Sequence, residues 1–238
     1  MSRSVGVGRF FGRFVGFLVA VAALPACGGK TIHLGNGRTD GAPCPHAQVA
    51  ATEVLWIGDS WIFTPGGQQT RVRDLARAAG AIGPNDDYVF GAAAAATMAA
   101  IANQYATQEA GATKVKVLIM DGGTWDTIVA NGSDASVTGA ASAFGTFLTQ
   151  VASDATVEHV IYCLPPELPG IPGVAALRPL VLQACMQSMV PCHFIDFQMP
   201  WDGHPEYTAS NGIFPTDAGA KVVADKIWAV MQESCIAQ

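Results

Sequence analysis

Along most of this chain, short runs of mostly apolar residues alternate with segments in which apolar residues recur at helical spacing. Five short runs predict β-strands, at residues 54–59, 87–92, 115–120, 159–164 and 192–197. Between and after them, apolar residues recur three or four positions apart. This spacing predicts helices around residues 72–79, over 94–110, around 144–151, from about Pro179, and after Thr216 as the N-cap. Strands that alternate with helices in this way are typical of a parallel sheet covered by helices on both faces, so the pattern predicts a three-layer α/β domain.

The N-terminal segment has a different pattern, which is typical of a targeting signal. Arg3, Arg9 and Arg13 form a basic region. The apolar run from Phe14 to Leu24 follows it and is too short to span a bilayer as a mature helix. Leu24-Pro25-Ala26-Cys27 then resembles a bacterial lipobox, in which the cysteine becomes the lipidated first residue of the mature protein. An ordinary secretory signal cleaved near Ala26 is the alternative.

This leader divides the chain into three expected parts. Residues 1–26 form the signal peptide, residues 27–50 the lipidated Cys27 with a flexible tether, and residues 51–238 the folded domain. Gly28 follows the cysteine, so the Asp that favours inner-membrane retention does not stand there. We therefore expect an outer-membrane lipoprotein or a secreted protein, which meets a membrane through its lipid anchor only.

Composition and charge narrow the choice of partners. Half of the residues are hydrophobic and 13% are charged, which is typical of a well-buried globular chain. Removal of the leader takes away three arginines and no acidic residue, so the formal net charge changes from −6 to −9. An acidic domain is a poor partner for nucleic acid or anionic lipid. We therefore expect a small-molecule ligand.

The cysteines indicate an oxidising compartment rather than a metal site. Cys185 and Cys192 could close a short helix-to-strand loop, and Cys44 and Cys235 could tie together the two ends of the domain. With Cys163, five cysteines lie beyond Cys27, so at least one thiol is free or pairs between chains. None has the Cys-x-x-Cys spacing of a zinc site, and we expect neither a metal nor another cofactor.

Candidate chemistry begins at Gly58-Asp59-Ser60, directly after the first apolar run. A buried strand that breaks at a glycine would place Ser60 at the carboxyl edge of the sheet, where open α/β folds bind ligands. A serine hydroxyl at this edge can act as a nucleophile when a base lies within reach. A turn with a helix-capping Asp or Ser is the alternative interpretation.

Together with later segments, this motif resembles the SGNH, or GDSL, hydrolase family over roughly residues 53–236. The family comprises esterases, lipases, thioesterases and carbohydrate deacetylases with a flavodoxin-like three-layer sandwich, so the resemblance implies a five-stranded parallel sheet in the order 2-1-3-4-5. Gly58-Asp59-Ser60-Trp61 matches the first block, which makes Ser60 the nucleophile. The second block corresponds to the segment from Gly91, where Ala95 stands at the position of the oxyanion-hole glycine. A backbone N–H survives that change.

Two further blocks depart from the family pattern. The third usually reads Gly-x-Asn-Asp and here reads Gly123-Thr124-Trp125-Asp126, so the oxyanion-binding Asn is replaced by Trp125, which we interpret as pocket lining. The last usually reads Asp-x-x-His-Pro. Here Asn211 stands at the position of the Asp and Phe214 at that of the His. A phenyl ring cannot accept a proton, so the aligned frame lacks a base.

A possible substitute lies upstream in Trp201-Asp202-Gly203-His204-Pro205. His204 would serve as the base if its loop folds back over the sheet edge, with Asp202 as the acid that orients it. The sequence thus predicts a secreted or lipid-anchored serine ester hydrolase, of the esterase or carbohydrate deacetylase type, with an altered site. The alternative is a pseudoenzyme that binds a glycan or acyl ligand without turnover. A structural envelope lipoprotein is a third interpretation.

Overall fold

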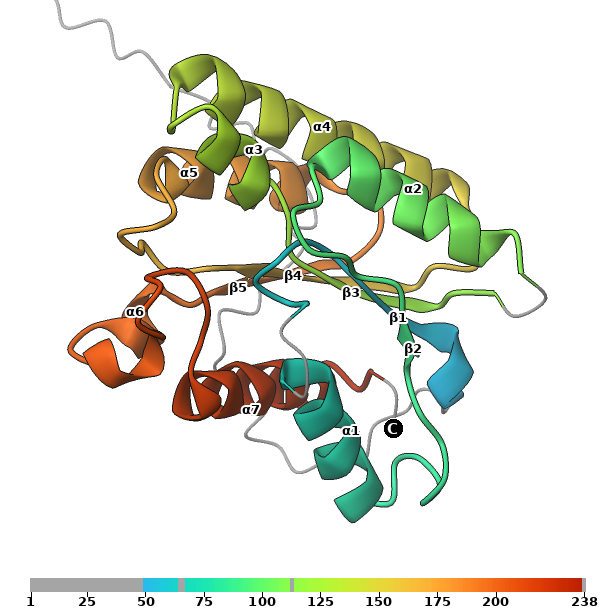
Figure 1. The fold of residues 1–238 in the computed structure, drawn as a ribbon. Coiled ribbons are helices and arrows are strands. Elements are labelled where there is room, and N and C mark those ends of the chain that lie inside the picture. Colours follow the sequence, from blue (N-terminus) through green and yellow to red (C-terminus); the bar gives the residue numbers. More distant parts are fainter. Residues whose placement is uncertain (1–48, 64–66, 112–113, 237–238) are drawn as a thin grey trace, which may run out of the picture. The chain divides into compact units, whose positions relative to one another are not determined.

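A computed structural model describes residues 49–63, 67–111 and 114–236 of the chain. Its centre is a five-stranded, fully parallel sheet in the order β2-β1-β3-β4-β5 (Figure 1). The strands are β1 (Val54–Ile57), β2 (Val89–Phe90), β3 (Val117–Met120), β4 (His159–Leu164) and β5 (Cys192–Asp196). The predicted fold class and strand order are therefore confirmed.

Helices cover both faces of this sheet. They are α1 (Gln68–Ala78), α2 (Met98–Glu109), α3 (Thr124–Val129), α4 (Asp134–Ser153), α5 (Val174–Gln187), α6 (Gln198–Trp201) and α7 (Asp217–Glu233), with 3₁₀ turns at Ala51–Glu53 and Pro205–Tyr207. Helices α2 to α5 lie on one face, and α1 and α7 lie side by side on the other (Figure 1). None of the helices in the described part of the chain is long and apolar enough to span a membrane.

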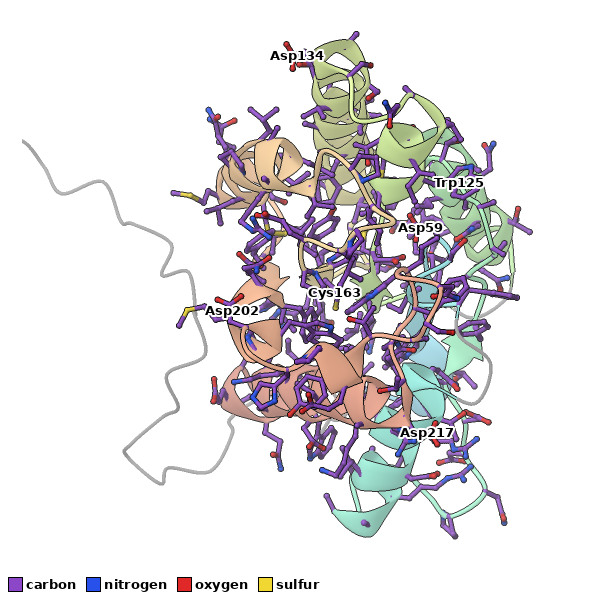
Figure 2. All side chains as sticks on the ribbon, turned by 60° about the vertical axis from the view of Figure 1, so that its left-hand side comes forward. Asp59, Trp125, Asp134, Cys163, Asp202 and Asp217 are labelled. Carbon is purple, nitrogen blue, oxygen red and sulfur yellow. A yellow bond between two sulfur atoms is a disulfide. The ribbon has the colours of Figure 1, made fainter. Side chains whose placement is uncertain are left out.

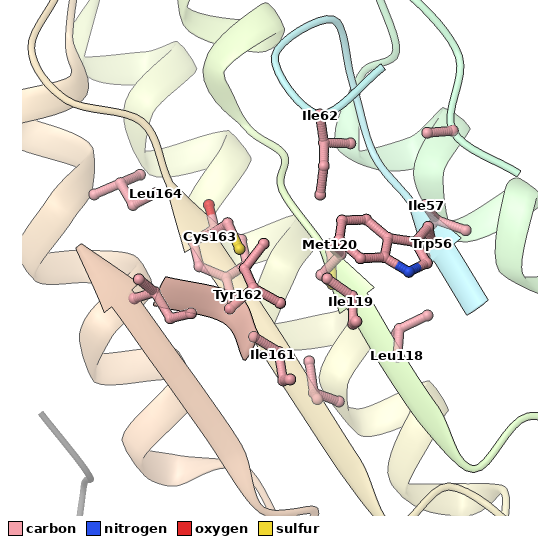
Figure 3. Close-up of a cluster of buried hydrophobic side chains, with 14 of the residues drawn as sticks. Trp56, Ile57, Ile62, Leu118, Ile119, Met120, Ile161, Tyr162, Cys163 and Leu164 are labelled. Atoms are coloured by element: carbon pink, nitrogen blue, oxygen red, sulfur yellow. The ribbon is translucent and has the colours of Figure 1, made fainter. Parts of the chain in front are cut away.

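Side chains fill the space between the layers (Figure 2), and the central strands are buried on both faces. All four residues of β1 and all four of β3 are buried, as the unbroken apolar runs predict for parallel strands between two helix layers. Figure 3 shows part of this core, where Trp56, Ile119 and Tyr162 lie on neighbouring strands. The packed core fixes the positions of the strand ends, and the candidate site lies at the carboxyl ends of these strands.

Local signals set most helix boundaries. The Thr216 side chain accepts a hydrogen bond from the N–H of Gly219, so the predicted N-cap of α7 is confirmed. Helix α2 begins at Met98 rather than at residue 94, because Thr97 caps it and Ala95 has a left-handed backbone with a φ of 57°. The prediction that α5 begins near Pro179 is wrong. The helix begins at Val174 after the left-handed Gly173, and the proline lies inside it.

The structure confirms one of the two cysteine pairs that the sequence suggested. Cys185 at the end of α5 and Cys192 at the start of β5 form a disulfide, as their spacing suggested. Cys163 is a free, buried thiol in β4. Cys235 is disulfide-bonded as well. Its proposed partner Cys44, like the predicted signal peptide and lipidation site, lies outside the described residues.

Candidate active site

The carboxyl ends of β1 and β3 bring the first and third motif blocks to one edge of the sheet. Strand β1 ends at Ile57 and is followed by Gly58-Asp59-Ser60, whereas β3 ends at Met120 and is followed by the start of α3. The two strands are paired in parallel, with Ile57 opposite Met120. Ser60 and Gly123 therefore lie at the same edge, as the parallel topology predicts.

Ser60 has a direct contact with the second block. The main-chain N–H of Ala95 donates a 2.7 Å hydrogen bond to the Ser60 Oγ. The left-handed conformation of Ala95 is one that glycine adopts without strain, which agrees with its alignment to a glycine position. Ala93 N–H bonds to the Gly58 carbonyl at 3.2 Å and holds the two loops together. The geometry thus places a backbone N–H donor directly against the Ser60 Oγ.

A cavity of about 40 Å³ lies beside Ser60. It is lined by three polar residues and six apolar ones: Asp59, Ser60, Thr124, Trp61, Trp125, Ile128, Ile171, Ile213 and Phe214. No imidazole is among its lining residues in the part of the chain that the structure describes.

Trp125 is bonded to Asp59 through its main chain and lines the cavity with its side chain. Its main-chain N–H donates to the Asp59 Oδ2 at 3.2 Å, and the Thr124 hydroxyl donates to the same oxygen. The Trp125 side chain lines the cavity, as predicted from its replacement of the family's Asn. Figure 2 labels Asp59 and Trp125 on the same side of the molecule.

Phe214 lines the same cavity from the loop that precedes α7. The Asn211 Oδ1 accepts the N–H groups of Ile213 at 3.0 Å and Phe214 at 3.1 Å, so Asn211 shapes the turn that presents the phenyl ring. The N–H of Ala209 bonds to the Phe214 carbonyl at 2.8 Å and closes the loop. These contacts hold a compact loop, and its phenyl group occupies the place where the family resemblance puts an imidazole.

His204 lies in a different hollow of about 700 Å³. Its Nδ1 is 2.8 Å from the Glu206 Oε1, its ring stacks on Tyr207 with centroids 4.5 Å apart, and 47% of its side chain is exposed. The hydrogen bond with His204 lowers the pKa of the Glu206 carboxyl. The structure thus does not bring the imidazole into the Ser60 cavity.

The prediction that Asp202 orients His204 is wrong. The Asp202 Oδ1 accepts a hydrogen bond from the Gln198 Nε2 at 2.8 Å, and Glu206 occupies the place of the imidazole's acidic partner. Asp202 also lies apart from Asp59 and Trp125 in Figure 2. The Pro205–Tyr207 turn begins directly after His204 and brings Glu206 back to the ring, a contact that the spacing of the motif did not reveal.

The two glycines assigned to the pocket have supporting positions instead. The N–H of Gly91 bonds to the Trp56 carbonyl at 2.7 Å and continues the pairing of β2 with β1. Gly123 has a left-handed φ of 84° and starts α3, where an added Cβ would lie 3.3 Å from Leu177. Neither is among the lining residues of the Ser60 cavity. Both fix the loops that carry the lining residues.

The sequence-based site omitted Asp121, the residue after β3. Asp121 is fully buried, and burial together with the nearby charge of Asp59 raises the pKa of its carboxyl well above the usual range. The signal in the sequence is an acidic residue at the end of the apolar run Val117–Met120. A carboxyl at such a position needs a specific set of hydrogen-bond donors.

Comparisons with known proteins support the fold and leave the chemistry open. No protein-family model matches the chain, and no curated protein matches it in sequence. Among solved structures, the family 3 carbohydrate esterase of Clostridium thermocellum is 15% identical, with a TM-score of 0.60, over 74% of this chain and 93% of that one. A member of the lipolytic G-D-S-L family from Veillonella parvula is 15% identical, with a TM-score of 0.58, over 75% and 97% of the two chains. The esterase EstA of a Pseudoalteromonas species is 11% identical, with a TM-score of 0.58, over 77% and 98%.

These neighbours define the class of fold. The chain adopts the fold of the SGNH/GDSL hydrolases and of the family 3 carbohydrate esterases. The identities are low, so the likeness establishes the arrangement of strands and helices and not the reaction.

Proposed function

We propose that the cavity beside Ser60 is an acyl-ester site that keeps the nucleophile end of an SGNH hydrolase and lacks its base. The chain would bind the acyl group of a short ester, such as an acetylated carbohydrate, without turning it over at hydrolase rates. The observation that carries this proposal is the position of Phe214, which lines the cavity where the family resemblance places a histidine.

The remaining polar groups support binding of a carbonyl. The N–H of Ala95 reaches the Ser60 hydroxyl, and this donor could turn to an ester carbonyl oxygen that binds beside the Oγ. The apolar walls from Trp125, Ile128 and Phe214 suit the methyl end of an acetyl group. Because a general base contributes about 10²–10⁴-fold to such reactions, its loss would leave binding intact and slow turnover by that order.

Hydrolysis with His204 as the base is the second candidate. It is favoured by the Ala95–Ser60 contact, in which the Oγ accepts and its own proton stays available to a base, and by the exposed position of His204 in a surface loop. In this case the loop around His204 would move toward Ser60 when the ester binds.

Binding and turnover of an acetylated xylo-oligosaccharide by the purified protein test the proposal. We expect calorimetric binding that Ile128→Trp weakens at least tenfold by filling the cavity. The matched variant Val129→Trp, at the next and exposed position, should bind as the wild type does. Turnover should stay near the buffer rate. If Ser60→Ala and His204→Ala instead abolish a measurable hydrolysis to a similar extent, the second candidate is correct.

We also propose that the mature protein is an envelope lipoprotein anchored through Cys27. Its lipobox-like Leu24-Pro25-Ala26-Cys27 and the basic and apolar segments before it support this location. An anchor at Cys27 followed by a tether of about two dozen residues would hold the Ser60 cavity within reach of surface or periplasmic glycans.

A further inference from the structure

Two buried carboxyl groups meet beneath Ser60. Asp59 follows β1 and is 2% exposed, and Asp121 follows β3 and has no exposed surface. The side chains are hydrogen-bonded to each other. Burial of two carboxyl groups side by side is costly unless donors surround them and one of them stays protonated.

The Asp121 carboxyl binds the peptide groups on both sides of Ser60. Its Oδ1 accepts the N–H of Asp59 at 2.7 Å, and its Oδ2 accepts the N–H of Ile62 at 3.1 Å. The approach is so close that a Cβ on Gly58 would lie 1.9 Å from the Asp121 Oδ1. Glycine at position 58 is therefore required by Asp121.

Asp59 continues this network toward α3. Its Oδ1 accepts the N–H of Trp61 at 3.0 Å, and its Oδ2 accepts the Thr124 hydroxyl and the N–H of Trp125. The two carboxyl groups thus connect the loop that carries Ser60 with the segment that lines the cavity.

We propose that Asp121 is a positioning residue for Ser60, which it holds against the N–H of Ala95 by fixing the peptide groups of Asp59 and Ile62. The inference rests on the proposed function only in naming an ester as the molecule that Ser60 meets. The Asp121 carboxyl, with its bonds to the N–H groups of Asp59 and Ile62, is called the clamp below. The geometry of the clamp is independent of whether an ester is bound or turned over.

The surroundings of Asp121 favour its neutral form. The groups that face it are Asp59, Tyr162 and Cys163, with Asp126 close to Asp59. The Tyr162 hydroxyl donates to the Gly122 carbonyl at 2.6 Å and so stabilises the adjacent peptide rather than a charge on Asp121. Burial, followed by the charge of Asp59, raises the pKa of the Asp121 carboxyl. A neutral Asp121 can donate a hydrogen bond to the Asp59 carboxylate through its hydroxyl, while its carbonyl oxygen stays a full acceptor.

The pH dependence of the unfolding equilibrium tests whether the Asp121 carboxyl is protonated in the folded state. The folded state holds the Asp121 proton more tightly than the unfolded chain, whose Asp pKa is about 3.9. As pH rises from this value through the raised pKa, this group should increase the unfolding equilibrium constant by up to about tenfold per pH unit, so the folded state should lose stability. We expect Asp121→Asn, which cannot ionise, to remove this contribution when its urea unfolding is compared with that of the wild type. Asp202→Asn should keep it.

Labelling of Ser60 tests the positioning itself. We expect Asp121→Ala to slow modification of Ser60 by a fluorophosphonate at least tenfold, as the loss of a hydrogen bond to a buried group implies. Asp121→Asn keeps one acceptor and a donor toward Asp59 and should stay within about threefold of the wild type. Mass spectrometry of the Ser60 peptide gives the rates, with Ser60→Ala as the blank.

The two measurements separate the proposals. Equal pH dependence of unfolding in the wild type and Asp121→Asn would overturn the neutral clamp, and equal labelling in Asp121→Ala and the wild type would overturn the positioning role. If the wild type is not labelled at all, Ser60 is not activated and the second candidate function, hydrolysis with His204, is wrong, while the pH dependence of unfolding still decides the state of Asp121.

Discussion

Ser60 and Phe214 line one small cavity, so a phenyl ring borders the space in which a serine hydrolase needs a base. The two residues lie more than 150 positions apart in the chain and meet because β1 and the loop before α7 end at the same edge of the sheet. The serine end of the site keeps its backbone donor, while the opposite end is apolar. This asymmetry is the basis of the first prediction.

Replacement of Phe214 by His together with Asn211 by Asp should create turnover. The backbone frame of the loop is already in place, so an imidazole at position 214 would enter the Ser60 cavity with an acid three residues before it. We expect hydrolysis of p-nitrophenyl acetate to rise by about 10²-fold or more. The same pair combined with Ser60→Ala is the control. A rise that persists without Ser60, or no rise at all, contradicts the interpretation of the frame.

Substitution of Gly58 by Ala should severely destabilise the protein. The added methyl group would overlap the Asp121 carboxyl, and the φ of 146° is unfavourable for alanine. We expect a loss of at least about 3 kcal/mol in the free energy of unfolding, or no folded protein. Gly139→Ala, at an exposed position inside α4 with no neighbouring atom within 4 Å, should instead stabilise by about 0.5–1 kcal/mol. Urea denaturation measures both, and similar values would refute the tight contact.

Removal of the Cys185–Cys192 disulfide should lower the free energy of unfolding by about 2–3 kcal/mol. The bridge closes a short loop of sequence separation 7 between α5 and β5, and its main effect is on the unfolded chain. The variant with both cysteines changed to alanine can be compared with Met186→Ala, which alters an exposed neighbour on the same helix. The prediction is wrong if the two variants unfold at the same denaturant concentration.

Mass spectrometry of the mature N-terminus should find a lipid-modified Cys27. The expectation follows from Leu24-Pro25-Ala26-Cys27 after a short apolar segment. Cys27→Ala should yield no lipid-modified peptide and should release the protein from the membrane fraction. An unmodified N-terminus anywhere in residues 26–30 would show an ordinary secretory signal instead.

Several features of the structure were predictable from the sequence because they depend on local periodicity. The five strands and the Thr216 cap follow from apolar runs and residue types. The strand order follows from the resemblance to the SGNH hydrolases, and parallel strands place Ser60 and Gly123 at one edge. Helix α3 escaped prediction because six residues are too few to show a period. The start of α5 was misplaced because Pro179 is tolerated inside the helix, whose first residue is set by the left-handed Gly173.

The sequence by itself determined the fold and the presence of Ser60 at the sheet edge, and it puts Phe214 where the family resemblance expects a histidine, since each depends on residue type and order. Only the tertiary structure decided which groups meet. It placed His204 against Glu206 and Tyr207, and it brought Asp121 to the peptides that flank Ser60. Such contacts join loops that are tens of residues apart, and they depend on the length and turn of each loop. A spacing pattern carries no information on that geometry, because a loop, unlike a helix or strand, has no fixed rise per residue.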